Sequence, residues 1–472
     1  MNVTLRALNR FGLGARQGER QRISDARGWL KAQLEAGAPT LRATESTSPT
    51  AIADAVRALR MPGQRDEQER REARRRLVEL AASEARAALD VRVTSDRPFV
   101  ERLVTFWSNH LCVSSGAKIL VAPLAGSYER DVIRPHVLGR FEDMVLASAK
   151  HPAMLAYLDN FQSIGPSSPG ARAGQRNNGA KRGLNENYAR ELLELHTLGV
   201  NGGYAQQDVQ ELARILTGWT IAGIPGPGAR IQPRPNTRGR GVVRQARPQQ
   251  DGPLGFAFQE FLHEPGEKTV LKQRYKEAGA AEGERAIRAL CGHPSTAKFV
   301  ATKLATHFIS DDPSPAAVDR LARAFRSSEG DLKAVALAIV DEPDAWREDA
   351  RKFRTPQDWF VAVLRAFGSM EVNPNAPVVL RQLRQPLWAP PSPKGFGDTM
   401  QEWADPDSLL NRGELARTIS RLPSVAAVDP RSLVDVVDVP AGNPLHTLIA
   451  DASIPARERV ALAIAGPAFQ WR

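Results

Sequence analysis

The sequence predicts an all-α protein: one large multi-helix domain with long loop insertions and at most a small β element. Apolar residues recur with helical spacing over most of the chain, while alternating strand patterns are scarce. Several segments begin with a capping residue ahead of a proline, as at Ser95-Asp96-Arg97-Pro98. The chain has 472 residues, of which 42% are apolar, so it can bury a core and is not globally disordered. An alternative division places a helical half at 1–222, a Gly/Pro/Arg-rich insertion at 223–266 and a second helical half at 267–472.

The expected helices follow one another with short polar breaks between them. A very charged helix with one narrow apolar stripe is expected at 66–89, followed by an aromatic-rich helix to residue 111. The remaining expected helices are 24–36, 140–149, 151–158, 184–199, 206–216, 281–291, 293–307, 316–326, 332–340, 355–367, 408–422 and one ending at 463. Phe256-Ala257-Phe258 is expected to be a short strand or turn. Gly-rich composition predicts flexible loops at 163–181 and 223–252, the second of them protease-sensitive.

The charge pattern limits the classes of partner. The net charge of +11 comes mainly from arginine, but 53 acidic residues are interspersed with it, so there is no strong nucleic-acid signal. Cys112 and Cys291 form neither a disulfide framework nor a zinc spacing and are expected to be buried thiols. The first residues lack the pattern of a signal peptide, and no apolar run is long enough to span a bilayer. These observations predict a soluble cytoplasmic protein.

The stretch from Leu184 to Gly199 combines strong helical periodicity with a dense set of polar side chains. On a helical wheel at about 100° per residue, Asn185 and His196 fall within its apolar face. Carboxylates on the neighbouring face make this central helix a candidate for acid–base chemistry, provided that burial raises the pKa of a carboxylate. The candidate catalytic residues are Glu186, Arg190, Glu191, His196 and His263.

The same helix also has a structural interpretation. Glu186, Arg190 and Glu194 are spaced i, i+4 and i+8, which is the spacing of an ordinary ion-pair ladder on a partly solvated face. A lone histidine on an apolar face is more often a core residue than a base. Burying so many polar groups for packing alone would nevertheless be unusual, because buried polar groups need hydrogen-bond partners.

Further candidates lie in other segments. His110 lies on the aromatic-rich helix, and His263 and Lys268 share the run His-Glu-Pro-Gly-Glu-Lys. The candidate binding residues are Asn185, His110, Lys268 and Trp219. No metal or cofactor is assigned, because His-Glu-x-x-His is absent and Glu194 and His196 project about 160° apart on a helix.

Several runs of residues resemble one large bacterial family. They are Asn185 to Val200, Trp107-Ser-Asn-His110, Leu216-Thr-Gly-Trp219, His293-Pro-Ser-Thr-Ala297, Lys303-Leu304, His307-Phe308 and Pro393-Lys-Gly-Phe396. The family is known only as domain of unknown function eighteen-hundred, and the resemblance runs from Leu8 to Gln470. It implies no activity. Members are often exported and often accompany sulfatase-like proteins of another uncharacterised family, so the resemblance implies such a partner. This sequence lacks an export signal, and it has Glu264 after His263 where the family favours Asp.

Three hypotheses follow from these observations. The first is an enzyme of hydrolase or lyase type that uses the central helix and His263. The second is an accessory protein that stabilises or presents a partner, and the third is a binder of anionic polymers through arginine-rich surface. We also expect the central helix to pack against the aromatic-rich helix, with at least one histidine, His110 or His196, in a hydrogen-bonded polar pocket.

Overall fold

The computed structural model describes residues 2–43, 47–60, 67–176, 183–223, 253–367, 375–426, 428–440 and 442–472. These residues form a mainly helical fold with two small antiparallel sheets, as the sequence predicts. The loop expected at 223–252 lies, except for Gly223, outside the described residues, so its protease sensitivity stays a prediction, as does the division of the chain into domains. No helix of the described residues is long and apolar enough to cross a membrane.

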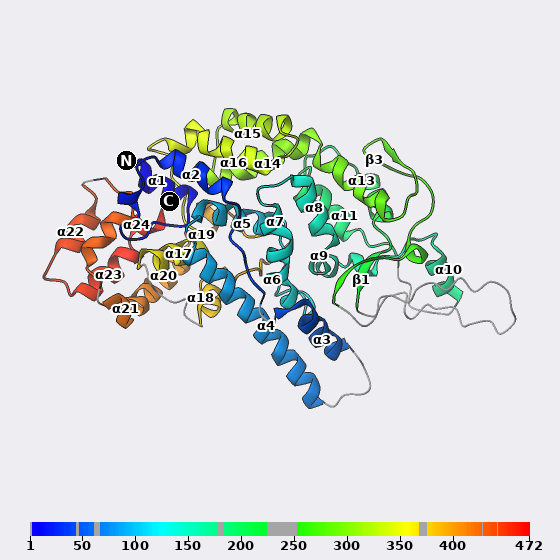
Figure 1. Cartoon of the computed structure of the whole chain (residues 1–472), viewed down its shortest axis with the longest axis horizontal. Coiled ribbons are helices and arrows are strands. Elements are labelled where there is room, and N and C mark those ends of the chain that lie inside the picture. The colour runs from blue at the N-terminus through cyan, green and yellow to red at the C-terminus, as the bar shows by residue number, and fades with distance from the viewer. Residues whose placement is uncertain are drawn as a thin grey trace.

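The first half of the chain begins with short turns and then builds the centre of the fold (Figure 1). Its α-helices are α1 (Val3–Arg6), α2 (Ala26–Glu35), α3 (Pro49–Arg60), α4 (Glu67–Thr94), α5 (Pro98–His110), α6 (Ala125–Tyr128), α7 (Arg134–His136), α8 (Phe141–Lys150), α9 (Pro152–Tyr157), α10 (Pro169–Arg176), α11 (Asn187–Glu191) and α12 (Gln206–Ile215). Three π-helical turns lie among them, namely η1 (Ala7–Phe11), η5 (Glu129–Ile133) and η7 (Leu192–His196). The short 3-10 turns are η2 (Arg20–Arg22), η4 (Ala122–Leu124) and η6 (Asn160–Gln162).

Two hairpin-like sheets separate the halves. Strand β1 (Trp219–Ala222) pairs with β2 (Gly255–Phe258), and β3 (Lys268–Val270) pairs with β4 (Gln273–Tyr275). The 3-10 turn η9 (Glu260–Leu262) joins the two sheets. Trp219, one of the candidate binding residues, begins strand β1.

The second half returns to helices. They are α13 (Ala280–Cys291), α14 (Pro294–Phe308), α15 (Pro315–Ser327), α16 (Leu332–Asp341), η10 (Pro343–Trp346), α17 (Pro356–Ala366), α18 (Ala376–Gln382), α19 (Met400–Trp403), α20 (Pro406–Ile419), α21 (Pro423–Ala426), η11 (Pro430–Val436), α22 (Pro444–Ala450), α23 (Ala456–Ala465) and α24 (Pro467–Gln470). Many start just ahead of a proline, at a residue whose side chain accepts a hydrogen bond from a backbone N–H of the first turn. His151 and His293 act in this way through Nδ1, at 3.1 and 3.2 Å. This capping role accounts for two of the eight histidines.

Two predictions about local structure are wrong. The segment 163–181, expected to be a flexible loop, contains helix α10, whose first turn is capped by Ser168. The central helix is shorter than expected: it begins at Asn187, and its last turn is π-helical. Asn185 precedes the helix, and its Oδ1 accepts a hydrogen bond from Asn187 N at 2.9 Å. Its amide therefore caps the helix instead of lying on a buried face.

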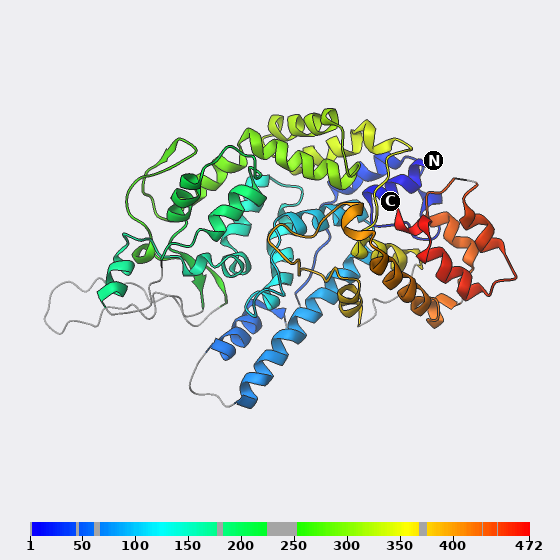
Figure 2. The same cartoon turned by 180° about the vertical axis from the view of Figure 1, so that it is seen from behind.

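The helices bury two clusters of apolar side chains. One is centred on α5, α8, α9, α12 and α14, and the other on α17 and the helices from α20 onward, with the end of α4. The long α4, with α3 alongside it, extends out of the body, whereas α5 lies at its centre (Figures 1 and 2). Trp29 and Trp388 pack against both clusters. The clusters therefore meet near α5, and the cavity described below lies at this junction.

Candidate functional site

The central helix presents its carboxylates to other side chains on a partly exposed face. Arg190 lies 3.4 Å from a carboxylate oxygen of Glu186 and 3.4 Å from one of Glu194. Gln206 on α12 donates to Glu186 at 2.7 Å and accepts from Arg190 at 2.8 Å. This confirms the ion-pair ladder and shows that Gln206 links it to α12. Glu191 is half-buried, and burial together with the neighbouring Glu194 raises the pKa of its carboxyl.

His196 is buried in the π-helical turn. Its backbone carbonyl lies 3.1 Å from His110 Nε2 on α5, which confirms that the two helices pack together. Neither ring nitrogen of His196 has a hydrogen-bond partner among the described residues. Burial, with the nearby charge of Lys303, lowers its pKa to about 3, so the ring is neutral at physiological pH.

His263 and Lys268 come together at a buried carboxylate that the sequence does not single out. Glu282 on α13 is fully buried, and its Oε2 lies 3.2 Å from His263 Nε2 and 3.3 Å from Lys268 Nζ. His263 Nδ1 lies 2.8 Å from the carbonyl oxygen of Thr217. Trp219 lies in the larger apolar cluster, with its ring edge-on to Phe256. The polar group formed by His263, Lys268 and Glu282 thus joins α13 to the sheets.

The candidate catalytic residues do not form one cleft in the described part of the chain. No described hydrogen bond or ion pair connects the ladder of Glu186, Arg190 and Glu194 to His263, and the ring of His196 is hydrogen-bonded to neither. The role of these residues in catalysis stays a prediction. Among the described residues, no group of three or more His, Cys, Asp or Glu side chains is arranged to hold a metal ion.

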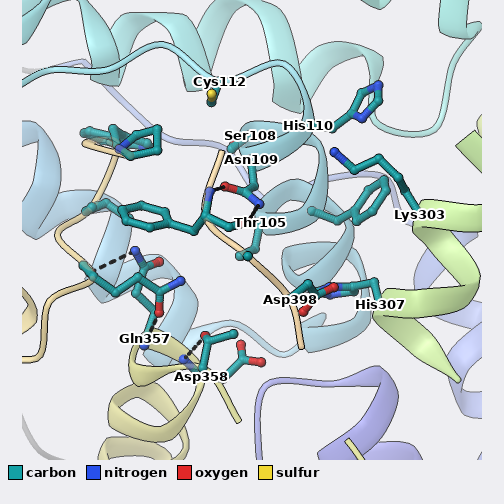
Figure 3. A pocket seen from close by; sticks show the side chains of 18 of the residues that line it. Thr105, Ser108, Asn109, His110, Cys112, Lys303, His307, Gln357, Asp358 and Asp398 are labelled. Atoms are coloured by element: carbon teal, nitrogen blue, oxygen red, sulfur yellow. Dashed lines mark hydrogen bonds and ion pairs between the residues drawn. The ribbon is translucent and has the colours of Figure 1, made fainter. Parts of the chain in front are cut away.

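A cavity of about 170 Å³ lies instead between α5, α14, the start of α17 and the segment 385–398 (Figure 3). Of the residues predicted to act or bind, it is lined by His110. Its walls are mainly apolar, and the apolar lining side chains include Phe106, Leu387, Trp388, Pro390 and Phe396. Seven charged or titratable groups also line it, namely Arg92, His110, Cys112, Lys303, His307, Asp358 and Asp398.

A reciprocal pair of hydrogen bonds fixes the segment 385–398 against α5. Asn109 Nδ2 donates to the carbonyl oxygen of Phe396, and Phe396 N donates to Asn109 Oδ1, both at 2.8 Å (Figure 3). Gly395 has φ +84°, and a Cβ there would lie 2.6 Å from the carbonyl oxygen of Asn109. A side chain would therefore collide with α5, which explains why the run Pro393-Lys-Gly-Phe396 needs glycine at this point.

His307 and Asp398 form a hydrogen-bonded pair on the cavity wall. His307 Nδ1 lies 2.7 Å from Asp398 Oδ2 (Figure 3). Burial lowers the pKa of His307 to about 4 even though Asp398 opposes this, so the ring is neutral at pH 7. In that state Nδ1–H donates to Asp398 and Nε2 carries the lone pair. His307 Nε2 is buried and has no partner among the described residues, so it can accept a proton or a hydrogen bond from a bound molecule.

Buried ion pairs hold this wall in place. Asp358 accepts hydrogen bonds from Arg102 at 3.0 and 3.2 Å and lies 3.2 Å from Arg472 Nε. Arg472 also lies 3.8 Å from Asp398, and Lys352 donates to the carbonyl oxygen of Asp398 at 2.5 Å. Arg102 and Arg472 keep the pKa of Asp358 below the ordinary range despite burial, and His307, with Lys352 and Arg472, does the same for Asp398. Both carboxylates are therefore charged at pH 7.

Sequence reasoning missed Asp398 and Asp358 and did not assign a role to Lys303 or His307. The signal that points to the cavity is the set of runs that carry the family resemblance. Four of them, containing His110, Lys303, His307 and Phe396, reach the same cavity although they come from three distant parts of the chain. Asp398 follows the last of these runs by two residues.

Comparison with known proteins gives one result. The family model described as "Protein of unknown function (DUF1800)" matches residues 6–471. No curated protein matches the chain. No solved structure matches it either. Because the matched region covers nearly the whole sequence, the chain belongs to the DUF1800 family of proteins of unknown function.

Proposed function

We propose that the protein is an enzyme that acts on a small molecule in the cavity between α5, α14 and the segment 385–398, with His307 as its general base. The observation that carries this proposal is the His307–Asp398 pair, at 2.7 Å, with His307 Nε2 unpartnered among the described residues. Asp398 holds the imidazole in the tautomer that leaves Nε2 free to take a proton. The chemistry is removal of a proton from water or from the bound substrate, a step that hydrolases and lyases share.

His307→Asn is expected to lower kcat/KM by about 10²- to 10⁴-fold. The asparagine amide reaches the position of Nδ1 and can still donate to Asp398, so the fold is kept while the base is lost. The measurement is a screen of the wild type against ester, amide and elimination substrates, followed by kinetics of the variant on any active compound. Because the pKa of His307 is about 4, kcat/KM should be flat between pH 6 and 8.

Glu186→Gln is the matched control, since it removes a carboxylate from the half-exposed ladder of the central helix. It should leave the kinetics unchanged. If Glu186→Gln abolished activity and His307→Asn did not, the site would lie on the central helix.

A second candidate function is that of an accessory protein that presents a partner, with the sulfatase-like protein implied by the family resemblance as that partner. The pairing of Glu186 with Arg190, and of His263 and Lys268 with Glu282, favours it, because paired groups serve the fold. Size-exclusion chromatography of the two proteins together tests this candidate. Co-elution at low micromolar concentration would support it, and separate elution would remove it.

A further inference from the structure

Lys303 is the charged side chain of the cavity that makes no direct ion pair with a described residue. It lies on α14 four residues before His307, so the two side chains share one face of the helix, toward the cavity. Among the other charged groups on the wall, Arg92 lies 2.7 Å from Glu129, Asp358 3.0 Å from Arg102, and Asp398 2.7 Å from His307. Lys303 makes no hydrogen bond or ion pair with any described residue.

Asp398, on the same wall, favours the charged form of Lys303, but its carboxylate is hydrogen-bonded to His307 instead. Its amine lies 5.8 Å from the centre of the Phe299 ring, and Figure 3 shows its side chain extending toward His110. Burial lowers the pKa of His110 and of His196, so both rings are neutral, and burial raises the pKa of the Cys112 thiol to about 12, so it is protonated. The exposed Lys394 adds further positive charge nearby. Burial lowers the pKa of Lys303 itself even though Asp398 opposes this, which is the expected effect on a buried ammonium group with no direct ion pair.

The apolar side chains and the volume of the cavity indicate the size and polarity of the ligand that it can hold. The apolar side chains of Phe106, Trp388 and Phe396 line the cavity, whose volume is about 170 Å³. A dry apolar cavity of about 150 Å³ in another protein admits benzene, so this space is suited to a ring-sized group. An apolar body and a single site for negative charge are thus present together.

From this geometry we infer that the cavity takes a small molecule with an apolar, ring-sized body and one anionic head, a carboxylate or a phosphate, bound by Lys303. The inference rests on the proposed function, because it names the substrate class of the same site. The anionic head meets Lys303 at one point on α14, and His307 one turn further along receives the proton. Lys303 is then a binding residue and His307 the base.

Binding of benzoate and phenyl phosphate, measured by isothermal titration calorimetry, tests the inference against neutral benzamide. The wild type should bind at least one of the two anions about 10- to 100-fold more tightly than benzamide, the range expected of a hydrogen bond to a charged group. Comparing the two anions distinguishes a carboxylate head from a phosphate head. In Lys303→Met this preference should be lost, while the melting temperature should be unchanged or higher because an unpaired ammonium is removed.

Lys298→Met is the control, because Lys298 is an exposed lysine on the same helix. This variant should keep the preference for the anion. His307→Asn should also keep the preference for the anion. If the folded His307→Asn protein binds the anion and the wild type turns over no substrate, the proposed role of His307 as base is contradicted. The inference about the ligand then still stands. Equal affinity of the wild type for anions and benzamide, no binding of either, or a preference retained in Lys303→Met would overturn the inference.

Discussion

Lowering the pH from 7 to 5 is expected to destabilise the protein strongly, well before its carboxylates titrate. Burial lowers the pKa of His110, takes those of His151 and His196 to about 3, and leaves that of His307 at about 4. In the unfolded chain a histidine has a pKa of about 6.5. Between about 6.5 and 4 the unfolded chain therefore binds protons that the folded protein excludes.

Because the unfolded chain binds more protons, the free energy of unfolding falls as the pH falls. Each of the four histidines should lower the free energy of unfolding by about 1.4 kcal/mol for every pH unit below about 6.5. Asp358 and Asp398, whose pKa values are lowered in the fold, add to the loss only below about pH 4. The measurement is urea unfolding at pH 8, 7, 6 and 5, with a steep loss expected below 6.5 and little change between 8 and 7. A free energy of unfolding that stayed constant from pH 7 to 5 would show that these histidines are not buried.

Glu129→Ala is expected to lower the free energy of unfolding by about 3–5 kcal/mol, the cost of removing one partner from a buried ion pair. Glu129 is fully buried and lies 2.7 Å from Arg92 and 2.8 Å from Arg134. The indole N–H of Trp388 also donates to it at 2.8 Å, which ties the cavity wall to this network. Removing the carboxylate leaves two buried guanidinium groups with less compensation.

The matched control is Glu67→Ala, which breaks the exposed pair of Glu67 and Arg71 at 3.3 Å on α4. That change should cost less than about 0.5 kcal/mol. Glu129→Gln keeps the volume and some of the hydrogen bonds, so its loss of free energy of unfolding should lie between the losses of the other two variants. It takes the place of Glu129→Ala in the comparison if that variant does not yield folded protein. Urea unfolding compares the three variants, and equal losses for Glu129→Ala and Glu67→Ala would contradict the buried network.

Local patterns in the sequence were enough to predict most helices. The proline-led start of α5, the caps of α9 and α14 and the spacing of Glu186 and Arg190 all act within one turn of helix, so they can be read from neighbouring residues. The π-helical turn at Leu192–His196 was not predicted, because a wheel of constant angle assumes regular α-geometry.

The cavity was not predicted, because it depends on contacts between distant parts of the chain. Its wall combines residues 105–112, 302–307, 355–358 and 385–398, which no short-range pattern relates. The density of polar residues in the central helix predicted a site there instead. In the fold that density is largely explained by the ladder around Arg190, with the ring of His196 left unpartnered among the described residues at the end of the helix. The two groups proposed to act in the cavity, His307 Nε2 and the Lys303 ammonium, lie on α14 instead.

Native mass spectrometry of the protein incubated with a small-molecule extract of its own host tests most directly whether the cavity is the functional site. The wild type should retain a small anionic molecule, and so should the double variant Glu186→Gln/Arg190→Gln in the central helix. The double variant Lys303→Met/His307→Asn should lose it while remaining folded. No retained molecule in the wild type, or a molecule lost with the central-helix variant and kept by the cavity variant, would contradict the account.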